Sequence, residues 1–534
     1  MGTAKAVCLI AACTSAMLIN TVNNTSVSVA LPTIGRELSI AENNLQWLIS
    51  SYSLSSGCLL IFLGRIADLH GRKTVWLLGF LWMLVFSLGC GFAQDEITVD
   101  VLRGLQGIGG AAIVPASLGI LAHAFPPSRT RSLAFATFSA GAPVGAAVGM
   151  ALGGILTQLS KPTWRSTFYL TSGLCLLAMA AGFYSIPPDH VSTEVDKRVD
   201  WLGAFLVTAG LVLIVFVLSD GEIAPNQWAT SYIITLLVLG VAFMVLFVLW
   251  QLYLERVQAD PTNPLARAHS KWTPPPLLKM SMWKRANGKF AIMQLIACVN
   301  WCSFMSWTFW VQLYYQNYAD LSPILTMVRM LPMFITGVVC NGIIALIIGR
   351  VDVLYIIVFG TLLTSFSNVF FAMINPDAPY WAFGFPAAIL SVFGADFVFA
   401  AGSLFIAKVS LPHEQSVAGA LFQTMTQLGT ALGLAVTTIV YDRVLATQSS
   451  LLGVTIDTSG TNAPKPAQLK AYQAAEWTAF GFGILGMVLS LFLRGVGIVG
   501  HVPEEDEKMG DEENERHEPL NEKSISQDSA DTRS

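Results

Sequence analysis

Long apolar runs constrain this chain more than any other feature of its sequence. Each run holds roughly twenty predominantly apolar residues, which is the length that an α-helix needs to cross the hydrocarbon core of a bilayer. Charged residues make up only 12% of the chain and hydrophobic residues 54%, which is too apolar for a soluble protein of this length. Strands of a β-barrel would alternate over about ten residues instead. We therefore predict an all-α polytopic protein in the lipid bilayer, with fourteen spans at residues 7–31, 46–66, 74–94, 98–122, 131–157, 166–187, 201–219, 230–252, 288–315, 322–348, 352–373, 380–407, 414–441 and 474–498.

The gaps between these spans fall alternately on two faces, and their charge distinguishes the faces. The set of gaps that includes both termini holds most of the 30 Lys and Arg residues. The opposite set holds Arg36, Lys161, Arg165, Arg443, Lys465 and Lys470. Because Lys and Arg accumulate in cytoplasmic loops, we predict a multi-pass protein of the plasma membrane with both termini in the cytoplasm.

A weak internal repeat predicts two halves. Residues 117–126, SLGILAHAFP, and 403–412, SLFIAKVSLP, share Ser, Leu, Ile and Pro, and a helix with Gly-x-x-x-Gly spacing follows each. Paired bundles of this kind are typical of transporters whose halves move against each other. The predicted units are a six-helix bundle at 1–187, two additional helices with a preceding cytoplasmic segment at 188–252, a cytoplasmic linker at 253–287, a second six-helix bundle at 288–498 and a disordered acidic cytoplasmic tail at 499–534.

The stretch Gly64–Lys73, GRIADLHGRK, packs charge and glycine between two of the apolar runs. Physically, Gly64 lets two helices approach closely, and Gly71 permits a positive φ. Asp68 can bond to nearby backbone or Arg groups. The sequence therefore predicts a tight basic turn at one membrane surface.

This stretch resembles the signature between the second and third helices of the major facilitator superfamily, with Leu69 where an Arg is usual. With the motifs below, the chain resembles a fungal drug:H+ antiporter of the fourteen-helix type over nearly its whole length except the tail. The resemblance implies the major facilitator fold, with two six-helix bundles plus two inserted helices. It also implies a gating loop in which Asp68 and Arg72 meet the start of the thirteenth helix around 414–418. The residues of this loop would be Gly64, Asp68, Gly71, Arg72 and Lys73. A basic turn that only sets the topology is the alternative.

Two further motifs support the resemblance. Leu102–Gly110 resembles the family pattern R-x-x-Q-G, which is associated with proton coupling. A buried arginine is costly unless it is paired or near water, so Arg103 should face the cavity rather than lipid. A purely structural Arg bonded to backbone carbonyls is the alternative. The other motif resembles the antiporter signature of the fifth helix and supplies a helix-packing surface through Gly145, Gly149, Gly153 and Gly154.

The chain departs from the family patterns at two further positions. Met150 replaces the usual proline of the antiporter signature. Residues 23–32, NNTSVSVALP, resemble the motif of the first helix, with Asn23 at the position of an aspartate. Asn cannot exchange a proton near neutral pH, so we expect Asn23 and Asn24 to bind substrate rather than protons.

Asp396 is the carboxylate that we predict to carry the proton. It is the one that lies away from the ends of the predicted spans. A buried Asp can load and release a proton when desolvation disfavours its charged form. An Asp paired permanently with Arg329 or with helix hydroxyls would be structural instead.

Aromatic and amide side chains suit a flat, amphiphilic or cationic ligand, because rings stack while amides orient it. The predicted substrate-binding residues are Asn23, Asn24, Gln106, Asn300, Trp301, Phe304, Trp307, Gln423 and Gln427. Trp310, Tyr314 and Tyr315 are interpreted as an aromatic belt at the membrane surface.

The predicted function is secondary active export of small organic compounds (drugs, toxins or secondary metabolites), by alternating access and in exchange for protons. The chain has no P-loop, no catalytic constellation and no metal-ligand spacing among its 8 cysteines, so we expect no enzyme activity, no cofactor and no metal. The expected partners are substrate, protons and lipid, with no nucleic acid, and the protein is expected to be a monomer. The alternatives are a uniporter or importer of a small solute and a transport-inactive sensor or scaffold that acts through the acidic tail.

Overall fold

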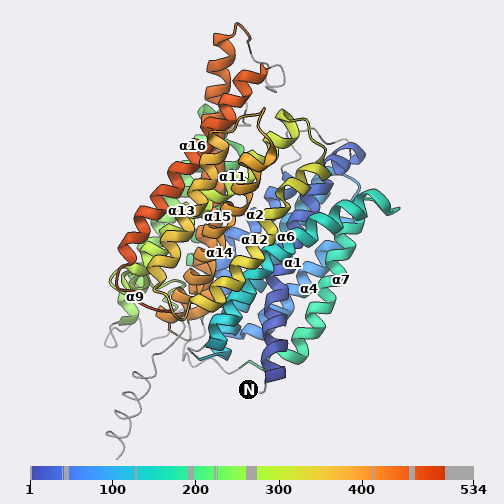
Figure 1. Ribbon diagram of the computed structural model, residues 1–534. Helices are drawn as coiled ribbons and strands as arrows, with labels where there is room; N and C mark the ends of the chain where they lie inside the picture. Colours follow the sequence, from blue (N-terminus) through green and yellow to red (C-terminus); the bar gives the residue numbers. More distant parts are fainter. Residues whose placement is uncertain are drawn as a thin grey trace, which may run out of the picture.

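The computed structural model describes residues 3–38, 40, 47–126, 129–189, 198–221, 224, 226–259, 273–411, 414–455 and 463–499. Within these residues the chain is helical, and the helices run roughly side by side (Figure 1). Thirteen helices in the described part of the chain are long and apolar enough to cross a membrane, or fourteen if one bent pair counts as a single span. The all-α membrane fold is thus confirmed. The acidic tail from residue 500 onward and residues 260–272 of the predicted linker lie outside the described residues.

The helices form two bundles with a hairpin between them in the chain order. The first bundle comprises α1 (Thr3–Leu38), α2 (Trp47–Cys58), α3 (Leu60–His70), α4 (Arg72–Phe92), α5 (Glu96–Ala124), α6 (Arg129–Leu159) and α7 (Arg165–Ser185). The hairpin comprises α8 (Trp201–Asp220) and α9 (Ser231–Ala259). The second bundle comprises α11 (Lys289–Leu313), which continues as a π-helical turn (Tyr314–Tyr318), followed by α12 (Pro323–Ile347), α13 (Val353–Ala372), α14 (Tyr380–Val409), α15 (Gln415–Leu451) and α16 (Lys465–Ser490).

Burial separates central helices from peripheral ones. The apolar windows of α5 and α14 are 89% and 83% buried, whereas that of α9 is only 17% buried. α5 in the first bundle and α14 in the second, each the fourth membrane span of its bundle, are therefore the central helices. α9 presents its apolar side chains outward, as a lipid-facing helix does. The two bundles meet along two seams, where α3 packs on α15 and α6 packs on α12.

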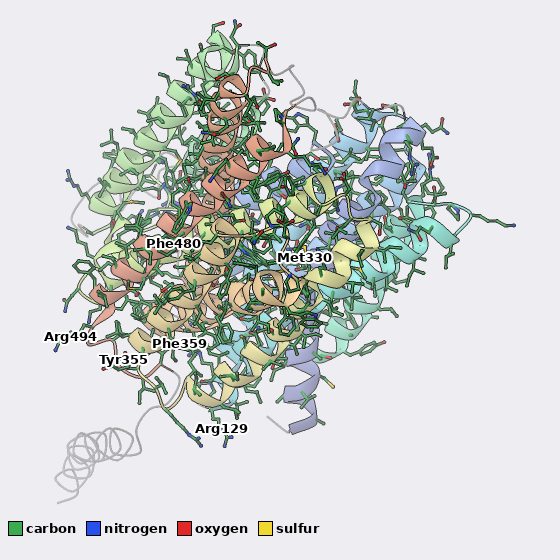
Figure 2. All side chains as sticks on the ribbon, turned by 45° about the horizontal axis from the view of Figure 1, so that its top comes forward. Arg129, Met330, Tyr355, Phe359, Phe480 and Arg494 are labelled. Carbon is green, nitrogen blue, oxygen red and sulfur yellow. The ribbon has the colours of Figure 1, made fainter. Side chains whose placement is uncertain are left out.

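The two ends of the bundles are named here by a residue at each. The Gly71 face is the end at which α3 ends and α4 and α15 begin, and the Asp95 face is the end at which α4 ends and α5 begins. In Figure 2, Arg129, Tyr355 and Arg494, which all lie near the Gly71 face, gather toward one edge of the molecule, and Met330 lies nearer its centre.

The α15–α16 pair extends beyond the predicted spans, which ended at residue 441 and began at residue 474. In Figure 1 this pair projects from the top of the molecule. Hydropathy detects only the apolar part of a helix, whereas Leu445, Ala467 and Ala471 pack into a small separate core that keeps the extension helical. The prediction of these boundaries was therefore wrong by several residues.

The interpretation of Trp310, Tyr314 and Tyr315 as an interfacial belt was also wrong. These side chains are only 3%, 5% and 3% exposed. They pack against rings from other helices of the second bundle, including Tyr441 at 4.4 Å from Trp310 and Phe371 at 5.8 Å from Tyr314, measured between ring centroids. Tertiary packing rather than the membrane surface therefore holds them.

Candidate functional site

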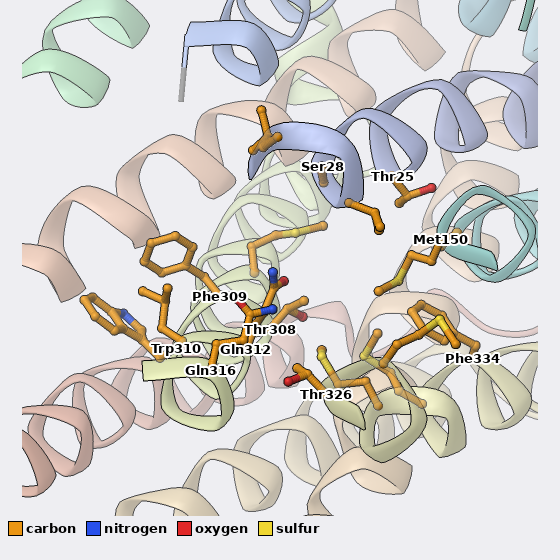
Figure 3. A pocket seen from close by; sticks show the side chains of 18 of the residues that line it. Thr25, Ser28, Met150, Thr308, Phe309, Trp310, Gln312, Gln316, Thr326 and Phe334 are labelled. Carbon is orange, nitrogen blue, oxygen red and sulfur yellow. The ribbon is translucent and has the colours of Figure 1, made fainter. Parts of the chain in front are cut away.

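A cavity of about 2320 Å³ lies between the two bundles. It is lined by α1 and α6 from the first bundle and by α11, α12, α14, α15 and α16 from the second. Figure 3 shows Thr25 and Ser28 on one side of it and Thr308, Gln312 and Phe334 on the others. The lining continues to helix ends at the Asp95 face, where Arg36, Leu159, Asn317 and Asp320 contribute. The cavity therefore extends toward the Asp95 face.

Contacts between α3 and α15 seal the other end of the molecule. Asp68, whose side chain is 1% exposed, accepts hydrogen bonds from the backbone N–H groups of Ser416 and Val417, both at 3.1 Å. These N–H groups belong to the first turn of α15, where unpaired donors and the helix dipole favour an anion. A Cβ placed on Gly64 would lie 2.9 Å from the Cβ of Ala420, so glycine is what allows this close approach.

Arg72 joins this contact from α4. Its guanidinium donates to Asp68 from Nε at 2.9 Å and from Nη2 at 2.7 Å. It also donates to the Ser416 hydroxyl at 3.2 Å and to the Gly119 carbonyl at 3.2 Å. One arginine therefore ties together α3, α4, α5 and α15 at the Gly71 face.

The turn between α3 and α4 is shorter than the sequence suggested, because α3 continues through His70 and α4 begins at Arg72. Gly71 alone breaks the helix, with φ of +109°. The carboxylate of Asp189 receives the backbone N–H of Lys73 at 2.7 Å and that of Thr74 at 2.9 Å, so it caps α4. The Lys73 ammonium donates to carbonyls at the end of α7. Lys73 thus connects elements of the first bundle.

A second charge cluster lies beside this seal. Glu414, which precedes α15, forms ion pairs with Lys279 and Arg285, both at 2.7 Å. Burial acts to raise the pKa of Glu414, but the hydrogen bonds and positive charges of Lys279 and Arg285 outweigh it and lower the pKa. The segment before α11 is thereby attached to the start of α15.

Arg103 lies in a buried polar network inside the first bundle. Its guanidinium donates to the Leu48 carbonyl at 2.8 Å, to Gln106 at 2.7 Å and to Asn24 at 3.3 Å. Gln106 in turn donates to Asn23 at 3.1 Å. Asn23, Asn24 and Gln106 are not among the residues that line the cavity. Arg103 does not line the cavity either, contrary to the prediction, because these partners hold it fully buried within the first bundle.

The glycines of α6 make a tight crossing with α1. A Cβ on Gly145 would lie 2.5 Å from the Leu18 carbonyl oxygen, and one on Gly153 would lie 2.7 Å from the Ser26 Cα. Gly149 contacts Thr25 still more closely. Gly154 differs, because the nearest atom to its Cβ position is 3.6 Å away. Three of the four predicted packing glycines are therefore in contact with α1, while the fourth lines the cavity.

Asp396 lines the cavity on α14, and its side chain is 8% exposed. One carboxylate oxygen, Oδ2, has no hydrogen-bond partner among the described residues. A Cβ on Gly337 of α12 would lie 3.1 Å from this oxygen and 2.8 Å from the Cβ of Pro143 on α6. Asp396 thus lies at the α6–α12 seam. Arg329 does not neutralise it but lies over the ring of Tyr315, at 5.2 Å.

Of the remaining predicted substrate-binding residues, some line the cavity and others do not. Trp301 and Phe304 line the cavity, whereas Asn300 and Trp307 are fully buried within the second bundle. Gln423 and Gln427 belong to α15, and neither is among the cavity residues. A Cβ on Gly57 of α2 would lie 3.2 Å from the Cβ of Gln427, which places Gln427 at the contact between the bundles.

Sequence reasoning missed the methionines of the cavity wall. They come from α1, α6, α11 and α12 and are Met17, Met150, Met305, Met327, Met330 and Met333. The Met-x-x-Met-x-x-Met spacing at 327–333 puts three of them on one side of α12, which was a readable signal. The replacement of the motif proline by Met150 was a second signal of this kind. Thioether chains are flexible and polarizable, so such a wall adapts to ligands of different shape.

Comparison with known proteins identifies the architecture. The family model of the Major Facilitator Superfamily matches residues 13–219 and 201–434. The chain belongs to the major facilitator superfamily. A puromycin resistance protein from Streptomyces alboniger is 32% identical, over 79% of each chain. The low affinity ammonium transporter of Saccharomyces cerevisiae is 26% identical, over 84% of this chain and 80% of the relative.

A solved structure supports the same fold. The human organic anion transporter MFSD10 (TETRAN) aligns with a TM-score of 0.65 over 92% of this chain and 100% of the other, at 13% identity. At that identity the likeness concerns the fold alone. The chain is therefore a membrane transporter of this superfamily, whose members carry small solutes across the membrane.

Proposed function

We propose that this transporter exports small organic compounds across the plasma membrane by alternating access, in exchange for protons. The observation that carries the proposal is the cavity of about 2320 Å³ between the bundles, which extends to one face and is separated from the other by the α3–α15 contact. Its volume exceeds the ≈ 300–1,000 Å³ of ordinary ligand pockets. A substrate enters or leaves such a cavity at one face until the bundles rock and expose the other.

The chemistry of the wall supports an organic substrate. Trp301 and Phe304 supply aromatic faces, and Thr308 and Gln312 supply hydrogen-bonding groups. The methionine wall adds adaptable apolar surface. The name of the puromycin resistance relative is consistent with an organic cargo of this kind.

The predicted orientation assigns direction. With both termini in the cytoplasm, the Gly71 face is cytoplasmic and the cavity opens outward. Asp68 and Arg72 then act as the cytoplasmic gate. In one half of the export cycle the outward-open protein releases substrate outside. In the other half this gate opens and the cavity faces the cytoplasm.

Asp396 is the residue we assign to proton coupling. It lines the cavity, its Oδ2 has no hydrogen-bond partner among the described residues, and it lies at the α6–α12 seam between the bundles. In the proposed cycle the bundles move relative to each other at this seam. When the seam closes and removes this carboxylate from water, its charged form becomes costly because it has no ionic partner. The closed arrangement of the seam therefore favours the protonated form. Loading and loss of the proton would therefore bias the two arrangements.

Transport in sealed vesicles with an imposed pH gradient tests this proposal. The full chain is compared with Asp396→Asn and with Asp377→Asn, which removes the same charge from an exposed loop at the Asp95 face. We expect gradient-driven flux of a panel of aromatic compounds in the full chain and in Asp377→Asn, and its loss in Asp396→Asn. Flux in Asp396→Asn that still follows the gradient would exclude Asp396 as the coupling residue, and flux of no compound would count against export.

Uniport or import of a small solute is the second candidate function. Asn23 at the position of the family's aspartate favours it, because an amide exchanges no proton. The name of the ammonium transporter relative is consistent with a small cargo. Flux that equilibrates with the substrate gradient and ignores the pH gradient would support this candidate instead.

A further inference from the structure

Glu476 is a buried carboxylate outside the cavity. It lies on α16 in a stripe of buried residues that includes Tyr472, Ala475, Ala479 and Gly483. Glu476 is 1% exposed, and neither carboxylate oxygen has a hydrogen-bond partner among the described residues. Glu476 was not predicted from the sequence, because it lay at the end of a predicted span that began at residue 474. In the structure α16 begins at Lys465, so Glu476 lies well inside the helix.

Contacts of its helix neighbours locate Glu476 between α11 and α13. One turn toward the Asp95 face, the ring of Tyr472 lies 6.1 Å from that of Trp310, between centroids. Two turns toward the Gly71 face, a Cβ on Gly483 would lie 3.0 Å from the Ser303 hydroxyl and also contact Ser365. With a rise of 1.5 Å per residue, Glu476 lies about 6 Å along the helix axis from Tyr472 and about 10 Å from Gly483.

Other polar groups in this part of the second bundle also lack a hydrogen-bond partner among the residues that the structure describes. They are Trp307 Nε1 and Trp310 Nε1 on α11 and Asn368 Oδ1 on α13, all buried. Trp307 and Asn368 are fully buried, and Trp310 is 3% exposed. Buried polar atoms in folded proteins normally have partners. Glu476 therefore lies in a part of the second bundle where several buried polar atoms on packed helices have no partner among the described residues.

The packed helices offer Glu476 no cation. α13 contains no Asp, Glu, Lys, Arg or His, and the only charged residue of α11 is Lys289 at its start on the Gly71 face. On α15 and α16, Arg443 and Lys470 are exposed, and Lys465 is paired with Asp320. The other titratable groups on these helices and on the π-helical turn, toward the Asp95 face from Glu476, are Asp442 on the cavity wall and Tyr314, Tyr315, Tyr318, Tyr441 and Tyr472. An ionised Glu476 would thus be an unpaired buried charge, which costs several kcal/mol.

Three aromatic rings of the cavity wall lie near Glu476, since one of them belongs to Tyr472, one turn earlier on the same helix. Trp310, Tyr441 and Tyr472 line the cavity, with 4.4 Å between the ring centroids of Trp310 and Tyr441 and 5.0 Å between those of Tyr441 and Tyr472. Glu476 is not part of the lining. The three rings, called here the ring layer, contact one another and form the cavity wall beside this part of α16.

We propose that Glu476 is a second proton-binding residue, protonated in this conformation and closed off from the cavity by the ring layer. The carboxylate takes one proton from cavity water when the ring layer opens and returns it to water in the other half of the cycle. No bond other than O–H is formed or broken. The place of this proton in transport rests on the proposed function, whereas its presence on Glu476 does not.

Infrared difference spectroscopy of the full chain in lipid nanodiscs tests the proposal near neutral pH. Isotopic labelling of glutamate carboxyl carbons identifies the C=O stretch of a protonated Glu. We expect one such band to be absent in Glu476→Gln and retained in Glu255→Gln, a control at the half-buried glutamate that accepts the Ser281 N–H. Loss of the band on addition of Na⁺ would indicate a metal-cation site and overturn the proposal, as would an unchanged spectrum in Glu476→Gln.

The unfolding temperature of Glu476→Gln shows whether the variant folds and gives a second test of the proposal. Gln has the shape and neutrality of a protonated Glu, so we expect Glu476→Gln to unfold at the same temperature as the full chain or higher. A drop in unfolding temperature would mean that the carboxylate is ionised and paired, which contradicts the proposal. The proton count per substrate should fall in Glu476→Gln if transport occurs, and the infrared result stands even if no substrate is carried.

Discussion

Replacing Asp68 by Asn perturbs the contact that seals the Gly71 face. The pair of Asp68 with Arg72 lies within the first bundle and survives when the bundles separate there. What opening breaks are the hydrogen bonds from Ser416 N–H and Val417 N–H, both at 3.1 Å, and the bond from Arg72 to the Ser416 hydroxyl at 3.2 Å. The cost of opening therefore comes mainly from the contacts of the Asp68 carboxylate with the first turn of α15.

The size of the effect follows from these contacts. A hydrogen bond to a charged group contributes about 1.5–3 kcal/mol. An anion at a helix N-terminus contributes roughly 0.3–1 kcal/mol, and up to about 2 in partly buried sites. Asn keeps one acceptor oxygen but loses the charge and the second oxygen. We estimate a shift of about 2 kcal/mol toward the conformation open at the Gly71 face, which is roughly 30-fold in the ratio of conformers.

Distances between spin labels measure this ratio. One label pair at His70 and Lys408, both exposed, spans the two bundles at the Gly71 face. A second pair at Leu159 and Ile324, which are 81% and 56% exposed, spans the cavity mouth. In Asp68→Asn we expect the first distance to lengthen and the second to shorten in a population that grows about 30-fold relative to the closed form.

Asp189→Asn is the matched control. It removes the same charge at the same face, but Asp189 caps α4 through Lys73 N and Thr74 N and makes these contacts within the first bundle. We expect it to lower thermal stability without changing the label distances. Unchanged distances in Asp68→Asn, or an equal shift in Asp189→Asn, would refute the reasoning.

Two further predictions concern packing and pH. Gly145→Ala places a methyl group 2.5 Å from a carbonyl oxygen of α1 and should destabilise the protein by about 1–3 kcal/mol. In Gly154→Ala the nearest atom to the new methyl group is 3.6 Å away, an ordinary van der Waals distance, so this variant should be neutral or raise stability by up to about 1 kcal/mol. Thermal unfolding in detergent compares the two variants, and equal effects would contradict the α1–α6 contact. The ion pairs of Glu414 with Lys279 and Arg285 lower its pKa below the ordinary 4.5, so their stabilisation is complete above that pH and lost as the pH falls through the lowered value. Glu414→Gln should therefore weaken the acid-induced loss of stability, measured as unfolding temperature against pH, and an unchanged acid limb would disprove this role.

Much of the architecture was readable from local patterns. The apolar runs predicted the helical membrane fold, and the family motifs predicted the superfamily that the family model matches. The glycine requirement at Gly71 was also readable, because a positive φ leaves few alternatives. These features depend on composition and short spacing alone.

The residues of the candidate site were harder to predict from the sequence. Asn23 and Gln106 were predicted to bind substrate, yet they are hydrogen-bonded to each other beside Arg103. Hydropathy detects that a helix crosses the bilayer but not which side of it faces a cavity, a neighbouring helix or lipid. Glu476 was missed for the related reason that a helix end cannot be located from hydropathy when packing extends the helix.

The apolar runs of this chain leave little choice of fold, because in a bilayer each backbone polar group must be bonded within its own helix or a closed barrel. Local sequence was therefore enough to define the helices and their family. The rotation and tilt of each helix depend on neighbours far apart in the chain. Only their packing together placed Asp68 against the first turn of α15, put Asp396 at the α6–α12 seam beside the cavity and buried Glu476 within the second bundle.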